Sequence, residues 1–260
     1  MINLIPMAGV GNRFLEEKYR VPKPFISIAG EPMFAAALRS FPPADRHIFL
    51  CRQEHAERLR KFMPERYRAA RIIEVPKPTE GQACTCLLAR GHLPPEEGLF
   101  IASCDYQTVY KEAAYQALLT DPEVDVIIWT LRIGAVKKAD PNAFAYCRTE
   151  GSRVTEVVEK RAISPTPHRD PAVVGSFTYK RASLFIEGAE AMIRKGVRVN
   201  GEYYVGTSIN QLIAAGRRVA AFEVDKFVSF GNPLELDLFH YWEDFFHRPE
   251  DTRLPFGFAR

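Results

Sequence analysis

Residues 6–14 read PMAGVGNRF and follow a short apolar run, INLI, at residues 2–5. An apolar run that ends in a glycine-rich turn indicates a buried strand that leads into a helix. Glycine lets backbone N–H groups approach an anion closely, and the next helix offers its positive end, so this arrangement often holds phosphates. The stretch is neither a GxGxxG nor a GxxxxGK[ST] motif, which disfavours the dinucleotide-binding and P-loop folds.

Two cationic side chains accompany the turn. Arg13 follows it directly, and Lys23 stands between two prolines in residues 22–33, PKPFISIAGEPM. A guanidinium donates a planar fork to phosphate oxygens, while a lysine supplies a compact charge. The prolines restrict the backbone of the lysine's loop. These features suit a polyphosphate; the alternative is structural, with Arg13 paired to Glu16 or Glu17 and Lys23 placed in an ordinary proline turn.

Apolar runs alternate with helical patterns through the first half of the chain. Strands are predicted at residues 46–52, 71–76 and 98–105, with helical patterns between them. Such alternation predicts an α/β fold with a mixed, mostly parallel central sheet flanked by helices. After residue 132, two apolar runs flank TEGS at residues 149–152, which predicts a hairpin. We expect residues 1–260 to form a single domain.

The bulk composition excludes several classes of function. The 260 residues are 47% apolar and carry a net charge of +3, with acids and bases mixed throughout. The sequence has no basic stripe of the kind that would predict a groove for nucleic acid or a surface that binds anionic membranes. The five cysteines show no CxxC spacing, which favours a reduced, cytoplasmic protein. No export signal or run of about 18 apolar residues is present, so we expect no membrane span.

The opening motifs together resemble those of the sugar-phosphate nucleotidyltransferases. That family begins with an apolar strand, AGxGxR, a spacer, PKP and then GxPM, and residues 8–13, 22–24 and 30–33 read AGVGNR, PKP and GEPM. The resemblance implies a Rossmann-like nucleotidyltransferase fold. It also implies catalytic roles for Arg13 and Lys23 and nucleotide binding by Ala8, Gly9 and Gly11.

Two further segments match the donor side of the family's site. Residues 78–90, PTEGQACTCLLAR, resemble its second nucleotide-binding segment, with Gly81 and Gln82 at the matching positions. The alternative is a buried amphipathic helix, which suffices for its apolar residues. Asp105 ends an apolar strand and matches the family's Mg²⁺-binding carboxylate; a hard cation requires such an oxygen ligand. The alternative for Asp105 is a helix cap or turn.

Three residues match the family's acceptor side. VVEKRA at residues 157–162 resembles VxEKP, with Arg161 in place of the proline, and the resemblance implies that Lys160 binds the acceptor phosphate. The alternative is an exposed charge on a hairpin strand. Gly175 matches a glycine beside the sugar, and Glu202 matches an acceptor-facing acid.

The main departure from the family lies in residues 227–239, FVSFGNPLELDLF, where relatives have WxDxGxP. Ser229 occupies the position of a second metal-binding aspartate. Three explanations remain open from the sequence. Asp225 compensates from four residues upstream, or Asp105 with phosphates and waters suffices, or the protein has lost activity.

The resemblance implies Mg²⁺-dependent transfer of a nucleotidyl group to a phosphorylated sugar or sugar-like small molecule, with release of pyrophosphate. CTP, dTTP, UTP and GTP all remain candidate donors, and relatives in bacterial capsule and lipopolysaccharide pathways suggest a role in cell-surface polysaccharide synthesis. A non-catalytic nucleotide-binding regulatory subunit is the alternative, and a glycosyltransferase is a weaker one because no DxD motif is visible at residues 103–105. Aromatic residues at helical spacing in 239–246 predict packing on the domain or in a homodimer.

Overall fold

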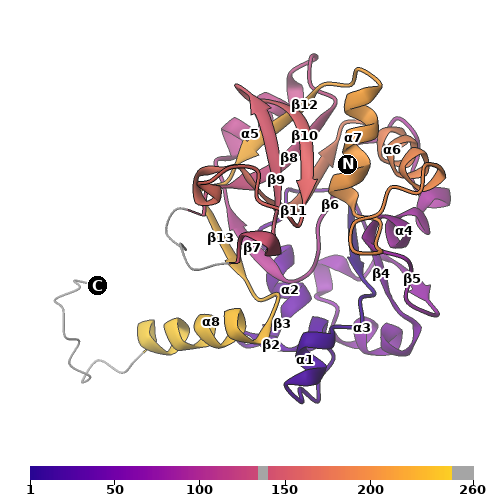
Figure 1. The fold of residues 1–260 in the computed structure, drawn as a ribbon. Coiled ribbons are helices and arrows are strands. Elements are labelled where there is room, and N and C mark those ends of the chain that lie inside the picture. Colours follow the sequence, from indigo (N-terminus) through magenta and orange to yellow (C-terminus); the bar gives the residue numbers. More distant parts are fainter. Residues whose placement is uncertain (134–139, 248–260) are drawn as a thin grey trace.

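The computed structural model describes residues 1–133 and 140–247, and its main sheet contains nine strands in the order β5-β4-β1-β6-β11-β8-β12-β10-β9 (Figure 1). In that order the strands are Arg71–Val75, Arg46–Arg52, Ile2–Met7, Leu99–Ile101, Ala172–Tyr179, Val126–Leu131, Val219–Glu223, Arg153–Glu159 and Ala145–Glu150. Two smaller sheets pair β7 (Tyr106–Val109) with β13 (Lys226–Ser229) and β2 (Ser27–Ile28) with β3 (Glu31–Pro32).

The main sheet is mixed and flanked by helices, which confirms the predicted α/β fold class, although only four of its eight neighbouring strand pairs are parallel, so the sheet is not mostly parallel as expected. β1 pairs in parallel with β4 and β6, β4 with β5, and β12 with β8. β11 lies antiparallel between β6 and β8, and β10 is antiparallel to β12 and β9. The predicted hairpin is the β9–β10 pair, which turns at residues 151–152.

Helices cover both faces of the sheet. α4 (Gln82–Leu87), α6 (Ala182–Arg194) and α7 (Val205–Ala214) pack on one face, and α2 (Met33–Leu38), α3 (Ala56–Phe62) and α5 (Glu112–Thr120) on the other. The position of β1 between the two helix layers explains why its sequence is almost wholly apolar. Ile2 and Leu4 face the first helix layer, whereas Ile5 and Met7 face the second, as expected for a strand buried on both sides.

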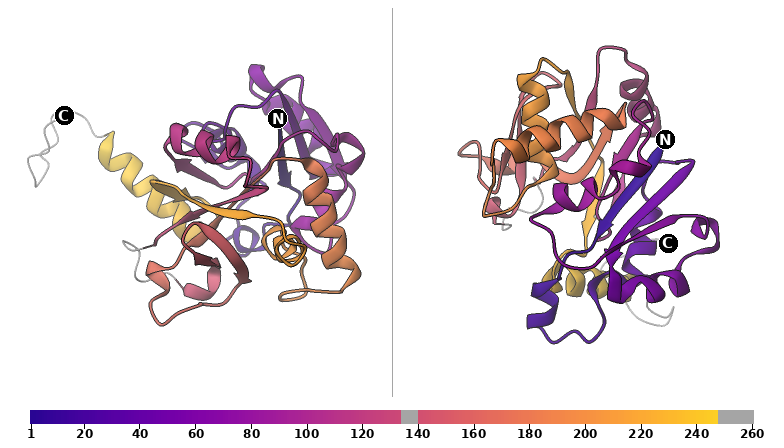
Figure 2. Two further views of the ribbon diagram at one scale, coloured as in Figure 1. Left: turned by 90° about the horizontal axis from the view of Figure 1, so that it is seen from above. Right: turned by 90° about the vertical axis from the view of Figure 1, so that its right-hand side faces the viewer.

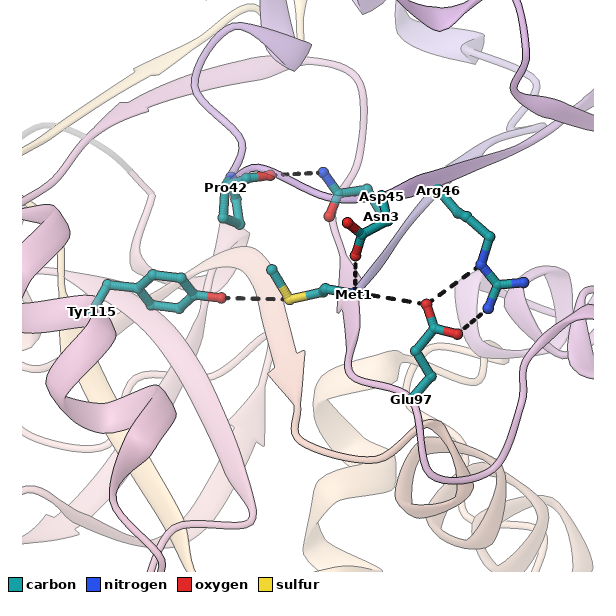
Figure 3. Close-up of polar contacts among 7 residues, drawn as sticks. All are labelled: Met1, Asn3, Pro42, Asp45, Arg46, Glu97 and Tyr115. Atoms are coloured by element: carbon teal, nitrogen blue, oxygen red, sulfur yellow. Dashed lines mark hydrogen bonds and ion pairs between the residues drawn. The ribbon is translucent and has the colours of Figure 1, made fainter.

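Polar contacts fix the beginning of β1 (Figure 3). The amino group of Met1 lies 2.6 Å from Asp45 Oδ2 and 3.6 Å from Glu97 Oε1. Asn3, although buried, donates from Nδ2 to the Pro42 carbonyl at 2.9 Å. These contacts anchor one end of the strand whose other end leads into the glycine-rich turn.

Two helices meet beneath that turn. α1 (Asn12–Glu16) buries Phe14 in a small apolar cluster with Met33, Phe230 and Leu236, the last of which belongs to the start of α8 (Pro233–Phe246). The cluster therefore joins the turn to the first part of α8, while the rest of α8 extends away from the body (Figures 1 and 2). Across residues 1–133 and 140–247, no helix combines the length and apolar character needed to span a membrane.

Candidate functional site

A cavity of about 570 Å³ opens at the carboxyl ends of the adjacent parallel strands β1 and β6. Open α/β sheets place their ligand sites at this edge. A second hollow of about 270 Å³ adjoins it and shares part of its lining, including Arg13, Asp105 and Lys160. The predicted site residues that line the larger cavity are Ala8, Gly9, Gly11, Arg13, Lys23, Gly81, Gln82, Asp105, Lys160, Gly175 and Glu202.

The glycine-rich turn forms one wall of the cavity. Gly11 has φ 73° and stands at the N-terminus of α1, where its carbonyl accepts from Phe14 N at 2.9 Å. Glycine adopts this left-handed conformation without steric cost. Arg13 is exposed beside the cavity, and within the described residues it forms no ion pair with Glu16 or Glu17. Its guanidinium is therefore available to an anion.

Lys23 and Asp105 meet in the floor of the cavity. Lys23 Nζ lies 2.5 Å from Asp105 Oδ2 and 3.0 Å from the Gly231 carbonyl oxygen, and Ser103 Oγ donates to Asp105 Oδ1 at 2.5 Å. Burial alone would raise the pKa of Asp105, but the Lys23 ammonium and these hydrogen bonds outweigh burial and hold the pKa below its usual range. Asp105 is accordingly a carboxylate at neutral pH.

Gly81 has a packing role that the sequence motif does not reveal. It precedes α4 with φ 130°, and a Cβ at this position would lie 2.5 Å from Tyr203 N. The adjacent backbone is tied to the same tyrosine, since Tyr203 N donates to the Glu80 carbonyl at 2.8 Å. Only glycine fits this approach. Gln82, the first residue of α4, lines both hollows and faces the ligand space.

The predicted acceptor residues line the same cavity. Lys160 follows β10, and its Nζ donates to the Ala143 carbonyl at 2.6 Å and lies 5.9 Å from the centre of the Tyr204 ring. Gly175 has φ 95° in an irregular part of β11, where a Cβ would contact Tyr106. Glu202 is exposed at the rim. The structure therefore brings the donor and acceptor residues of the motif to one cavity.

Asp225 does not reach this cavity, so its predicted role as a second metal ligand is wrong in this structure. Its backbone N–H donates to the Val109 carbonyl at the far end of β7, whereas Ser229 pairs with Tyr106, next to Asp105. Four residues of extended strand span roughly 13 Å. Asp225 is exposed at the wrong end of β13.

Sequence reasoning assigned no role to two acidic residues that line the smaller hollow. Glu159, at the end of β10, is partly buried, and burial raises its pKa to about 7 despite the adjacent Lys160. Its Oε1 would lie 2.5 Å from a Cβ on Gly206, so the glycine makes room for the carboxylate. Glu235, in the first turn of α8, accepts a hydrogen bond from Ser229 Oγ at 2.6 Å. The only signal for Glu235 was its position after Asn232-Pro233, which predicts a helix start.

The fold is shared with solved nucleotide-transferring enzymes. A nucleoside-diphosphate-sugar pyrophosphorylase from Vibrio cholerae superposes with a TM-score of 0.74 at 21% identity, over 92% of this chain and 99% of that one. The inositol-1-phosphate CTP transferase from T. maritima superposes with a TM-score of 0.71 at 13% identity, over 95% of this chain and 96% of that one. A putative glucose-1-phosphate thymidylyltransferase from Bacillus anthracis gives 0.72 at 15% identity, over 98% and 97%.

The sequence assigns the chain to a family within this class of nucleotidyltransferases. Residues 4–167 match the MobA-like NTP transferase domain, and the chain belongs to that family. It is also 25% identical over 256 residues to the bifunctional protein GlmU of Nitrosococcus oceani, a match that covers 96% of this chain and 53% of the relative. The chain therefore spans about half the length of that curated relative. The predicted enzyme class, a nucleotidyltransferase, is confirmed by the family.

Proposed function

We propose that the protein transfers a nucleotidyl group from a nucleoside triphosphate to a phosphorylated sugar or sugar-like molecule and releases pyrophosphate. The observation that carries the proposal is the convergence of Arg13, Lys23 and Asp105 on the cavity beside the glycine-rich turn. The turn offers backbone N–H groups, and the two cations suit a triphosphate. Lys160 lines the same cavity and provides a cation for the phosphate of the acceptor.

The reaction needs no general base. The acceptor phosphate is already ionised at neutral pH, so one of its oxygens attacks the α-phosphorus in line while the bond to the β-phosphate oxygen breaks and pyrophosphate leaves. Positioning and charge neutralisation then account for the rate. In this scheme Arg13 and Lys23 bind the triphosphate and the departing pyrophosphate, and Lys160 orients the acceptor.

The residues present fit a magnesium ion. Asp105 is ionised, Ser103 Oγ donates to it at 2.5 Å, and Ser229 and Gly231 line the same hollow. Mg²⁺ prefers such hard oxygen ligands, usually one or two carboxylates with substrate phosphates and waters. When bound, it would neutralise charge on the triphosphate. Asp105 is the residue we expect to hold it.

We further propose that the protein acts in the cytoplasm, in the synthesis of nucleotide-activated precursors for cell-surface polysaccharide, and that it pairs with a second copy. The support for pairing is the exposed apolar face of α8, which includes Leu234, Leu238, Tyr241, Trp242 and Phe246. Apolar residues gathered on one exposed surface often mark an interface.

A pyrophosphate-release assay tests the reaction. CTP, UTP, dTTP and GTP are each combined with a panel of hexose-1-phosphates, heptose phosphates and non-sugar polyol phosphates in the presence of Mg²⁺. We expect pyrophosphate from one nucleotide with one acceptor class and a matching nucleotide-linked product. Pyrophosphate release that does not depend on an acceptor, or no release from any pair, contradicts the proposal.

A further inference from the structure

We infer that Glu235 supplies a second carboxylate, with Asp105, for a divalent-cation site in the cavity. The inference rests on the proposed function and deepens it, because it names the residue that makes up for the serine at position 229. That residue comes from the first turn of α8 and not from β13, where the sequence motif places it.

The hydrogen bonds of Glu235 set it apart from an ordinary helix-capping residue. Its backbone N–H donates to Asn232 Oδ1 at 3.0 Å, so Asn232 caps α8 and Glu235 is the third residue of the first turn. A glutamate at this position commonly bonds back to the N–H of the capping residue. Here the carboxylate instead accepts from Ser229 Oγ at 2.6 Å, which directs it to the end of β13.

The same carboxylate lies close to Asp105. A Cβ built on Gly231 would stand 3.4 Å from Asp105 Oδ2, 3.4 Å from Glu235 Oε2 and 3.2 Å from Ser229 Oγ. The two carboxylate oxygens are therefore no more than twice 3.4 Å apart, with the serine hydroxyl beside them. Gly231 leaves a methyl-sized space among three oxygens, and any other residue would fill it.

The ion pairs at this position leave the Glu235 carboxylate available to a cation. Lys23 lies against Asp105 and the Gly231 carbonyl, whereas no ion pair involves Glu235 within residues 1–133 and 140–247. Glu235 is therefore a carboxylate without an ion-pair partner in the described chain, and it shares the lining of the smaller hollow with Asp105 and with the cations Arg13 and Lys160. Hard oxygen donors, carboxylates above all, suit Mg²⁺ or Mn²⁺. Because Mg²⁺ retains several waters, each carboxylate can act directly or through water.

Ser229 then acts as a positioning residue. Its Oγ donates to Glu235 and accepts from Gly231 N at 3.1 Å, so one hydroxyl holds the carboxylate and the loop between β13 and α8 together. The serine that interrupts the motif thus has a defined role: it orients the substitute ligand.

Mn²⁺ binding tests the inference without reference to activity. Free Mn²⁺ is measured by electron paramagnetic resonance during titration of the whole protein and of Glu235→Gln, Asp105→Asn and Asp244→Asn. Asp244 is an exposed acid on the same helix and serves as the matched control. We expect Glu235→Gln and Asp105→Asn each to weaken Mn²⁺ binding at least tenfold, in line with losses seen around metal sites, and Asp244→Asn to leave it unchanged.

A rescue variant separates ligand loss from a general defect. Adding Ser229→Asp to Glu235→Gln restores a carboxylate at the motif position, and we expect it to recover most of the Mn²⁺ affinity. Equal affinity in Glu235→Gln and Asp244→Asn, with a loss only in Asp105→Asn, overturns the role of Glu235 and leaves the proposed function standing. Absence of Mn²⁺ binding by the unmodified protein contradicts the metal proposal itself.

Discussion

Lys23 and Asp105 are 82 positions apart in the sequence, yet Lys23 Nζ lies 2.5 Å from Asp105 Oδ2. The contact forms because β1 and β6 are neighbouring parallel strands, so the segments that follow them emerge at the same edge of the sheet. It places an ammonium group and a carboxylate on the floor of one cavity. The predictions below follow from this arrangement.

Replacement of the two cations should abolish most of the activity. We expect Arg13→Ala and Lys23→Ala each to lower kcat by about 100- to 1000-fold, the loss typical of removing one preorganised electrostatic partner. Arg20→Ala is the control, since Arg20 is exposed and close in sequence but lines neither hollow. Turnover is measured with circular dichroism as the check of folding. Near-normal rates in both folded variants would refute these roles.

The raised pKa of Glu159 predicts a pH-dependent stability. Glu159 has a pKa of about 7 in the folded state, whereas the ordinary pKa of a glutamate is 4.5. Between these two pH values the folded state therefore binds more protons than the unfolded state. Stability contributed by the protonated form is present at low pH and is lost as pH rises through that window. The complete shift corresponds to roughly 3 kcal/mol.

Urea unfolding at several pH values checks this behaviour. We expect the free energy of unfolding of Glu159→Gln to increase relative to that of the unmodified protein as pH rises from 4.5 to 7. Glu156→Gln is the matched control, because Glu156 is an exposed residue of the same strand. Parallel pH profiles for Glu159→Gln and the unmodified protein would show that Glu159 titrates normally.

A methyl group at position 81 should destabilise the fold. A Cβ on Gly81 would lie 2.5 Å from Tyr203 N, and the residue has φ 130°, so Gly81→Ala forces the segment before α4 away from Tyr203. We expect a loss of about 1–3 kcal/mol, typical of overpacking. Gly91→Ala is the control, since nothing lies within 4 Å of its Cβ position. Equal stability of the two variants would contradict the close approach.

The exposed face of α8 predicts an association between two copies. We expect the unmodified protein to have the mass of a dimer by light scattering and the double variant Trp242→Ser, Phe246→Ser to have that of a monomer, since both side chains are exposed. Leu15→Ser provides a control at an exposed apolar residue on α1. A dimer that survives the α8 changes, or a monomeric unmodified protein, contradicts pairing through this helix.

The parts of the site that follow the motif were predictable from the sequence because they are local. The wall of the cavity around Gly11 and Arg13 follows from a few consecutive residues: a buried strand, a glycine turn and a cation. Asp105 was predictable because a carboxylate after a buried strand falls at the ligand edge of the sheet. These signals depend on strand ends, which hydrophobic periodicity locates well.

Residues that depend on distant packing were not predictable. Asp225 is the nearest acid to Ser229 that the sequence suggests, but the β7–β13 pairing directs it to the wrong end of the strand. Glu235 enters the site because the packing of Leu236 and Phe14 fixes the start of α8 beside the turn. Similarly, the pKa of Glu159 follows from burial, which no spacing in the sequence shows.

The most direct test of the central claim is nucleotide binding by the unmodified protein and by Lys23→Ala, measured as a thermal shift with CTP, UTP, dTTP and GTP in the presence of Mg²⁺. A ligand at about 100 times its Kd stabilises by roughly 2.7 kcal/mol, and each kcal/mol raises Tm by about 2–4 °C in a chain of this size. We predict a shift of several degrees with one nucleotide that Lys23→Ala largely loses. No shift with any nucleotide, or equal shifts in both proteins, would contradict the assignment of this cavity to the triphosphate.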